Sequence, residues 1–356
     1  MNSKSMNSMT NRNSIFACVA VLWFCQVLAT QVVGQDKVYP KQGAVASGKI
    51  QEINRSEVII EVRGNKQTLP LAEVRKITFD NEPSGLDRAR ELFLQEQYDQ
   101  VYEEIKKLDL STVKNPLVAQ DIDFYRYYSE GKLGLMGTGG DKEKAAAGLV
   151  ALARKNGNSH HMFELSELLG DLAVALGKPE GAVNYYNLLL SAPTPDLKAR
   201  GVYRLASLEL GQGKTVEART RFQQLTGASA STPAMARLKG LGEVGIAVCD
   251  ARDGKPQQAL EQLKQLVEKN DSSDQELFAR IYNAQGACYT ALNQDGLAVL
   301  AYLRTDLLFF SDADAHAEAL YYLSKLWPKI GEPGRAAESR SRLVAQYAGS
   351  TWANKN

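Results

Sequence analysis

The sequence predicts a mainly α-helical solenoid of repeated helical hairpins that follows a small antiparallel β segment. Three observations predict this fold class. Apolar and polar residues alternate with period two from residue 46 to residue 79, and the apolar period becomes helical after residue 85. A frame of glycine, alanine and a large apolar residue then recurs at intervals of about 40 residues, which indicates internal repeats.

These patterns divide the chain into five parts. We expect a signal peptide at 1–34, a linker at 35–45 and a small β-sheet or partial barrel at 46–80. A solenoid of about 6–7 hairpins should follow at 86–350, with a short tail at 351–356.

The first 34 residues have the composition of a secretory signal peptide. Lys4 and Arg12 are the charges of a polar start, and the stretch 15–29 is almost entirely apolar. A run of this length is typical of the apolar part of a signal peptide and short for a membrane span. Small residues suit cleavage after Ala29 or after Gly34. We therefore expect a secreted or periplasmic protein, or one at the cell envelope, without an integral span after cleavage. A retained anchor is the alternative.

Overall composition and charge are ordinary. Of the 356 residues, 44% are hydrophobic and 23% are charged, as in folded soluble proteins. The formal net charge is +1, so no global field attracts nucleic acid or an anionic membrane. We expect no nucleic-acid partner.

The β segment reads as three or four strands. SGKIQEI, SEVIIEVRGNKQTLP and AEVRKITF alternate, with turns at 54–55 and 63–65, and Val58 and Ile60 should face one side. About 35 residues bury little core alone, so the segment should lean on the helices. It resembles the small barrels of the Sm-like kind. Acidic residues dilute its basic ones, which disfavours an RNA-binding role and leaves docking or spacing as the expectation.

The repeat is clearest between residues 166 and 193. There, in order, stand Leu169–Gly170, Gly177 at a turn, Ala182, Tyr186 and Pro193. This pattern resembles the tetratricopeptide repeat. The small anchor residue of each repeat is Val101, Ala145, Ala182, Ala218, Ala259, Ala298 or Ala336.

The repeat frame has a physical logic. A glycine, or once Asn293, stands five residues before most anchors and ends the first helix in a left-handed conformation. The small anchor lets the second helix approach the first, and a large apolar residue one turn later fills the groove between hairpins. Arg340 departs from this pattern, because an apolar residue belongs there. The resemblance implies a right-handed superhelix with an extended inner groove.

The glycine-rich stretch GLMGTGGDK, residues 134–142, is interpreted as a joint between two helices. A phosphate-binding loop needs G-x-x-x-x-G-K-[ST] after a buried strand, whereas here Gly139 is followed by Gly140 and Asp141. Gly140 also occupies the turn position of a repeat.

The sequence contains no convincing catalytic or metal-binding motif. We expect His160 and His161 at a surface or in an N-terminal helical turn rather than on a metal, because adjacent side chains diverge on a helix. Asp312 should cap the helix that carries His316, with a weak metal pair as the alternative. Cys249 and Cys288 should be buried free thiols. We expect no enzyme, no cofactor and no metal.

The inner groove is the predicted functional surface. In repeats of this kind the first helix of each hairpin lines the groove. Arginine and asparagine there suit peptide binding, because they hydrogen-bond carboxylates and peptide backbone. The alternative is that these side chains merely solvate an empty groove. The partner-binding candidates are Arg200, Tyr203, Arg280, Asn283, Tyr321 and Lys325.

The end of the chain, LVAQYAGSTWANK, resembles the close of cell-envelope tetratricopeptide proteins of the Tol–Pal accessory and outer-membrane-assembly type. Those proteins act as adaptors. The resemblance implies an exported, non-enzymatic scaffold that binds a partner protein or peptide in its groove, with a homo-oligomer as an option. The alternative is an accessory glycan- or cell-wall-binding subunit, which would want clustered tyrosine and tryptophan.

Overall fold

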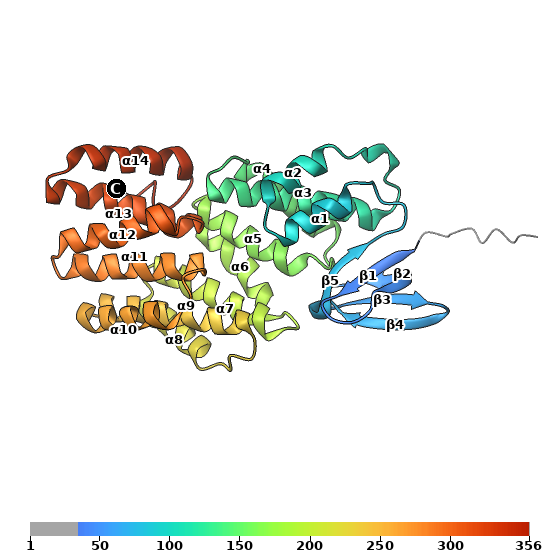
Figure 1. Ribbon diagram of the computed structural model, residues 1–356, viewed down its shortest axis with the longest axis horizontal. Coiled ribbons are helices and arrows are strands. Elements are labelled where there is room, and N and C mark those ends of the chain that lie inside the picture. Colours follow the sequence, from blue (N-terminus) through green and yellow to red (C-terminus); the bar gives the residue numbers. More distant parts are fainter. Residues whose placement is uncertain (1–34, 356) are drawn as a thin grey trace, which may run out of the picture. The chain divides into compact units, whose positions relative to one another are not determined.

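The computed structural model describes residues 35–355, which form one compact unit (Figure 1). The expected signal peptide lies outside the described residues. Within them a small antiparallel sheet is followed by α-helices to the end of the chain, which confirms the predicted fold class.

The sheet has five strands in the order β4-β3-β2-β1-β5, all antiparallel to their neighbours. Arg63 and Gly64 both have positive φ and make the tight turn between β3 and β4. Val58 and Ile60 are fully buried on one face, as predicted. The strands are β1 (Asp36–Pro40), β2 (Ala46–Ile53), β3 (Glu57–Val62), β4 (Asn65–Pro70) and β5 (Val74–Thr78).

The predicted linker at 35–45 is wrong for its first half. Residues 36–40 form β1, which pairs with both β2 and β5 and so lies inside the sheet. Val38 is fully buried there. The pattern here is too short to predict a strand. Val38 stands between Lys37 and Tyr39, and Pro40 and a turn with Gly43 at positive φ follow. This segment is a strand because it pairs with β5, whose residues lie almost forty positions away in the sequence.

The described helices form seven hairpins, each made of two consecutive α-helices that pack against one another. The hairpins are α1 (Leu86–Leu94) with α2 (Tyr98–Lys106), α3 (Pro116–Met136) with α4 (Lys142–Lys155), α5 (Met162–Ala175) with α6 (Pro179–Leu190), α7 (Pro195–Gly211) with α8 (Thr215–Thr226), α9 (Pro233–Arg252) with α10 (Pro256–Lys269), α11 (Gln275–Ala291) with α12 (Asp295–Leu308), and α13 (Ala313–Leu326) with α14 (Pro333–Tyr347).

The repeat frame is confirmed in all seven hairpins. Each predicted anchor lies in the second helix of its hairpin and is 0–8% exposed. The residue five positions before each anchor has positive φ and lies in the turn between the two helices. In the first hairpin this residue is Glu96, at φ 57°. The other six are Gly140, Gly177, Gly213, Gly254, Asn293 and Gly331.

Glycines in the first helices let an aromatic ring of a neighbouring helix come close. A Cβ atom at Gly170 would lie 2.2 Å from the ring of Tyr186, and one at Gly286 would lie 2.5 Å from the ring of Tyr302. Both rings are buried. These glycines therefore set the distance between the two helices of their hairpins.

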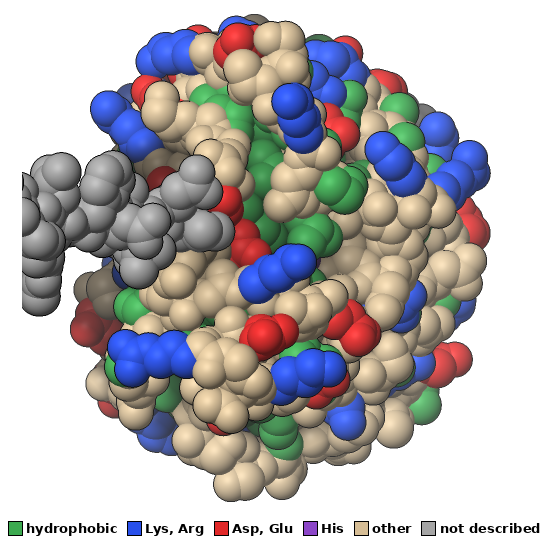
Figure 2. All heavy atoms as spheres, turned by 90° about the vertical axis from the view of Figure 1, so that its right-hand side faces the viewer, with side chains coloured by type: hydrophobic (Ala, Val, Ile, Leu, Met, Phe, Trp, Pro, Cys, Tyr) green, Lys and Arg blue, Asp and Glu red, His purple; other side chains and the backbone are tan. Residues whose placement is uncertain are grey.

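The sheet and the first three hairpins share one hydrophobic core. That core runs from Val38 in β1 to Leu172 in α5. Lys76 of β5 adds ion pairs to Asp87 and Glu91 of α1, with Nζ–O distances of 2.6 and 2.7 Å. Figure 2 shows the end of the molecule that carries the sheet, where basic and acidic side chains are interspersed. The predicted leaning of the sheet on the helices is confirmed.

The last hairpin and the tail contact the second and third hairpins. A Cβ atom at Gly137, which caps α3, would lie 3.0 Å from the backbone oxygen of Gln346 in α14. A Cβ atom at Gly349 would also lie 3.0 Å from the carbonyl oxygen of Ala175 in α5. Arg340 donates a hydrogen bond of 2.8 Å to the carbonyl of Ala353, which explains an arginine at a repeat position where an apolar residue was expected. The end of the solenoid therefore returns to its second and third hairpins and closes the coil.

We predict that Gly170→Ala destabilises the protein by about 2 kcal/mol, since overpacking against Tyr186 outweighs the helix propensity gained. Gly181→Ala is the matched control. Gly181 lies in α6 of the same hairpin with nothing within 4 Å of its Cβ position. That control should be neutral or stabilised by up to about 1 kcal/mol. Chemical denaturation measures both, and equal effects of the two substitutions would contradict the packing role.

Candidate functional site: the inner charge ladder

Charged side chains on the inner faces of α5, α7, α9, α11 and α13 lie close together, and most of them form ion pairs with a neighbouring first helix. We call this set the inner charge ladder. Its members are Glu164, Glu167, Asp171, Arg200, Arg204, Arg237, Glu276, Arg280, Asp312, Asp314 and Glu318.

The ladder begins between α5 and α7. Glu167 accepts hydrogen bonds from Arg200 and from Arg204, the latter at 3.1 Å. Arg204 also lies 3.3 Å from Asp171, and it reaches Glu276 of α11 at 3.9 Å, two hairpins away. Burial alone would raise the pKa of Glu167, but the two arginines outweigh burial and lower it. The contact from α7 to α11 shows how narrow the inside of this solenoid is.

The ladder continues from α9 to α13. Arg237 contacts Glu276 at 2.6 Å, and Arg280 contacts Asp312 and Asp314 at 2.7 and 2.8 Å. Asp312 also accepts the backbone N–H of Ala315 and caps α13, as predicted. Charges of α9 thus pair with α11 and charges of α11 pair with α13, whereas α7 reaches α11 directly.

Three polar atoms, two of the ladder and one of the neighbouring Asn283, are buried without a hydrogen-bond partner. They are Oε2 of Glu164, Nε of Arg280 and Oδ1 of Asn283. Burial, followed by the neighbouring Asp314, raises the pKa of Glu318 to about 7. The ladder is therefore not fully satisfied within the chain, and it holds a carboxyl that titrates near neutral pH.

Aromatic residues close the ladder at its C-terminal end. Tyr321 and Tyr322 of α13 lie with ring centroids 5.8 Å from that of Trp352 in the tail. Lys355 lies over all three rings, and the indole N–H of Trp352 donates to Asp314 at 2.9 Å. This cluster joins the tail to the inner face.

The six predicted binding residues are all on or beside this face, with different exposure. Arg200 is 38% exposed and Lys325 is exposed as well, over the ring of Tyr321. Tyr203 and Tyr321 are buried, and Asn283 is buried with hydrogen bonds to Ala315 and Glu318. Arg280 is engaged with α13, as described above. Whether these six residues bind a partner stays a prediction.

Sequence reasoning overlooked several members of the ladder. Arg204 follows Arg200 by one helical turn, so its place on the same face was visible in the spacing. Glu276 lies in the first turn of α11, where acidic residues are common and carry no signal, and Arg237 lies just beyond the first turn of α9. Trp352 reaches the inner face only because the tail folds back.

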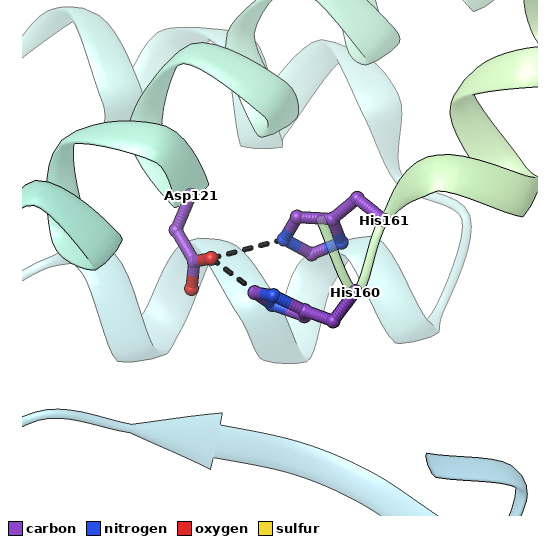
Figure 3. A group of neighbouring side chains, drawn as sticks. All are labelled: Asp121, His160 and His161. Carbon is purple, nitrogen blue, oxygen red and sulfur yellow. Dashed lines mark hydrogen bonds and ion pairs between the residues drawn. The ribbon is translucent and has the colours of Figure 1, made fainter. Parts of the chain in front are cut away.

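The two adjacent histidines differ from their expected place. His161 is the N-cap of α5, which fits an N-terminal turn, but both side chains are nearly buried rather than at the surface. They precede the helix, so the divergence of adjacent side chains on a helix does not apply. Figure 3 shows both rings directed at Asp121.

Other expectations on chemistry are confirmed. Residues 137–141 connect α3 and α4, and Asp141 caps α4. His316 hydrogen-bonds Asp306 and Tyr347, each at 2.8 Å. Cys249 and Cys288 are buried free thiols, and burial raises the pKa of Cys288 to about 11.

The outer face of α12 differs from those of its neighbours. Leu297, Leu300, Leu307 and Leu308 fall on one side of this helix and are 46–63% exposed. The equivalent positions of α10, 39 residues earlier in the repeat frame, are Gln258, Glu261, Glu268 and Lys269. The apolar stripe therefore belongs to this hairpin rather than to the repeat.

Among residues 35–355, no helix has the length and apolar character needed to cross a membrane.

Comparisons with known proteins give structural likeness only. No family model matches the sequence. No curated protein matches it either. A tetratricopeptide repeat protein from Parabacteroides merdae is 14% identical with a TM-score of 0.48, covering 74% of this chain and 91% of its own. PilW, a type IV pilus biogenesis factor, is 16% identical with a TM-score of 0.37, and the match covers 60% of this chain and 90% of PilW. Pseudomonas aeruginosa pilF is 18% identical with a TM-score of 0.36, and the match covers 67% of this chain and 97% of pilF.

We predict that Glu318→Gln stabilises the protein relative to wild type as pH rises from about 5 to about 8. The folded pKa of about 7 lies above the ordinary value, so the wild type loses stability as this carboxyl ionises. The difference should reach on the order of 1 kcal/mol, discounted because the side chain keeps partial solvent access.

Thermal or urea unfolding at several pH values measures this difference. The exposed Glu338→Gln is the control for removing one negative charge. A Glu318→Gln difference that stays constant from pH 5 to pH 8 would contradict the raised pKa.

Proposed function

We propose that this tetratricopeptide-like protein is an exported, non-enzymatic scaffold that binds a segment of a partner protein along the inner charge ladder. The observation that carries the proposal is a dense set of acids and arginines that is incompletely satisfied and reaches solvent at its rim. Arg200 is 38% exposed, Arg237 is 44% exposed and Asp314 is 50% exposed.

Such a surface suits a polar, extended peptide. Exposed ion pairs contribute little to stability, so a partner's carboxylates or amides can replace them at small cost. The aromatic cluster at Trp352 would hold an apolar side chain at one end and so fix the direction of the peptide.

Export is part of the proposal and rests on the leader pattern. Cleavage after Ala29 or after Gly34 falls before β1, which begins at Asp36. Either cleavage would leave all five strands on the mature protein. The resemblance of the chain's end to envelope adaptors favours the periplasm or the cell envelope.

A second candidate function is binding of glycan or cell-wall material. The observation that favours it is the cluster of Tyr321, Tyr322 and Trp352, because flat aromatic faces suit sugar rings. The cluster is small beside the ladder, so the protein-binding proposal comes first. The capture experiment below separates the two by the chemistry of what is retained.

We predict that the tagged protein captures a protein from envelope extract and that Arg200→Gln with Lys325→Gln weakens the complex. Neutral glutamine removes the two exposed charges without placing a new carboxylate beside Glu167. Affinity for the purified partner should fall about tenfold, equivalent to about 1.4 kcal/mol. Calorimetric titration measures it, with circular dichroism to verify folding.

The matched control is Lys255→Gln with Lys264→Gln, which removes one exposed charge at the N-cap of α10 and one within that helix. It should keep affinity within about twofold. Equal loss in both variants would argue for non-specific charge. Binding that survives the ladder variant and is lost in Leu300→Glu would place it on α12 instead. Retained sugar with no protein would favour the glycan candidate.

We predict that the full chain is exported and that its mature N-terminus is Thr30 or Gln35. Cell fractionation with mass spectrometry of the N-terminal peptide measures this. A chain lacking residues 2–34 should stay in the cytoplasm. Cytoplasmic full-length protein that keeps Met1 would disprove export, and envelope protein that keeps Met1 would indicate a retained anchor.

A further inference from the structure

Three metal-ligating side chains converge where α3 meets the loop before α5 (Figure 3). Nε2 of His161 lies 2.9 Å and Nε2 of His160 lies 3.3 Å from the same carboxylate oxygen, Oδ1 of Asp121. The potential ligand atoms of the three residues lie within 4.8 Å of one another. In the described part of the chain no other group of three such residues meets this distance.

Asp121 is held in place by its other oxygen. Oδ2 accepts hydrogen bonds from Arg90 at 2.9 and 3.3 Å, and Arg90 is also bound by both oxygens of Glu82. Arg90 is buried. Oδ1 is therefore left to face the histidines. A carboxylate that binds a cation through one oxygen and an arginine through the other is oriented before the cation arrives.

The imidazole of His161 is held just as firmly. The ring of His161 stacks on Phe124 with centroids 3.8 Å apart and planes 5° from parallel. Its backbone N–H donates to the hydroxyl of Ser159, which itself accepts from Gln120 at 2.6 Å. The loop therefore presents both rings to one point without a regular helix. Fixed rotamers of this kind are what a binding site needs.

The donor set selects a class of cation. Two imidazole nitrogens and one carboxylate oxygen suit Zn²⁺ and similar late transition metals, whereas Mg²⁺ and Ca²⁺ prefer oxygen alone. When both imidazoles are neutral, Arg90, Asp121 and Glu82 together carry one net negative charge. Glu164, close enough to interact electrostatically with His160, adds a further carboxyl group. The surroundings therefore favour a dication over an anion.

We propose that Asp121, His160 and His161 bind a divalent transition-metal ion, with Zn²⁺ the best match. Each neutral imidazole offers the lone pair of Nε2 to the ion when its single proton lies on Nδ1. Metal binding therefore releases no proton from either imidazole. The side chain of His160 is 9% exposed, so solvent reaches this side of the cluster. Water would fill the remaining coordination positions of the ion. The ion joins the loop before α5 to α3 and, through Arg90 and Glu82, to the end of the sheet.

The test uses the full-length protein, purified without a polyhistidine tag and stripped with EDTA. Addition of Zn²⁺ at about 100 times its dissociation constant should raise the unfolding temperature by about 5 °C, and Mg²⁺ should not. Co²⁺ should give the visible absorption of a low-symmetry site with nitrogen ligands. His160→Ala should lose both responses. Asn158→Ala, an exposed residue of the same loop, should keep them.

We choose to substitute His160 because it lies at the edge of the cluster. Asp121→Asn would remove the partner of a buried arginine and would threaten folding. No response in the wild type would overturn the proposal. Responses that persist in His160→Ala would overturn it too, since the metal would then bind elsewhere. His316, the third histidine, is engaged with Asp306 and Tyr347 and lies outside this cluster.

Discussion

A single hairpin in this protein is too thin to cover its own apolar side chains, and the rest of the structure follows from that constraint. The second helix of each hairpin offers a small residue at the crossing point, so that the two helices approach and their neighbours stack. Where the first helix has a glycine, such as Gly170 or Gly286, an aromatic ring enters the gap. The sheet is subject to the same constraint and completes its core on the first three hairpins.

The repeat could be predicted from the sequence because its determinants are local. A small anchor, a left-handed residue five positions earlier and a large residue one turn later all fall within one hairpin. Even Glu96, which no propensity would place in a left-handed conformation, adopts it because its hairpin needs the turn. What the sequence could not reveal depends on distant contacts. β1 is a strand because β2 and β5 flank it, and the histidines are buried because α3 brings Asp121 to them.

The binding candidates show the same limit. Spacing placed Arg200, Arg280 and Asn283 on the inner face, yet it could not tell that their partners come from the next hairpin. Charges on this face hold consecutive hairpins in register. For the proposed function they would serve a second purpose, because their exposed ends would exchange with a polar ligand. Because both purposes use the same atoms, binding along the ladder would alter the contacts between hairpins, and we expect ligand binding and solenoid rigidity to be coupled.

The closed turn limits how this protein can vary. An open solenoid tolerates gain or loss of a repeat, because each unit touches only the one before and the one after. Here Gly137 and Ala175 lie against the last hairpin and the tail, so a chain with one hairpin more or fewer would misplace those contacts. The number of repeats is therefore fixed by geometry in the way that the blade number of a closed propeller is fixed. Evolution of this molecule would proceed by substitution within hairpins rather than by duplication of them.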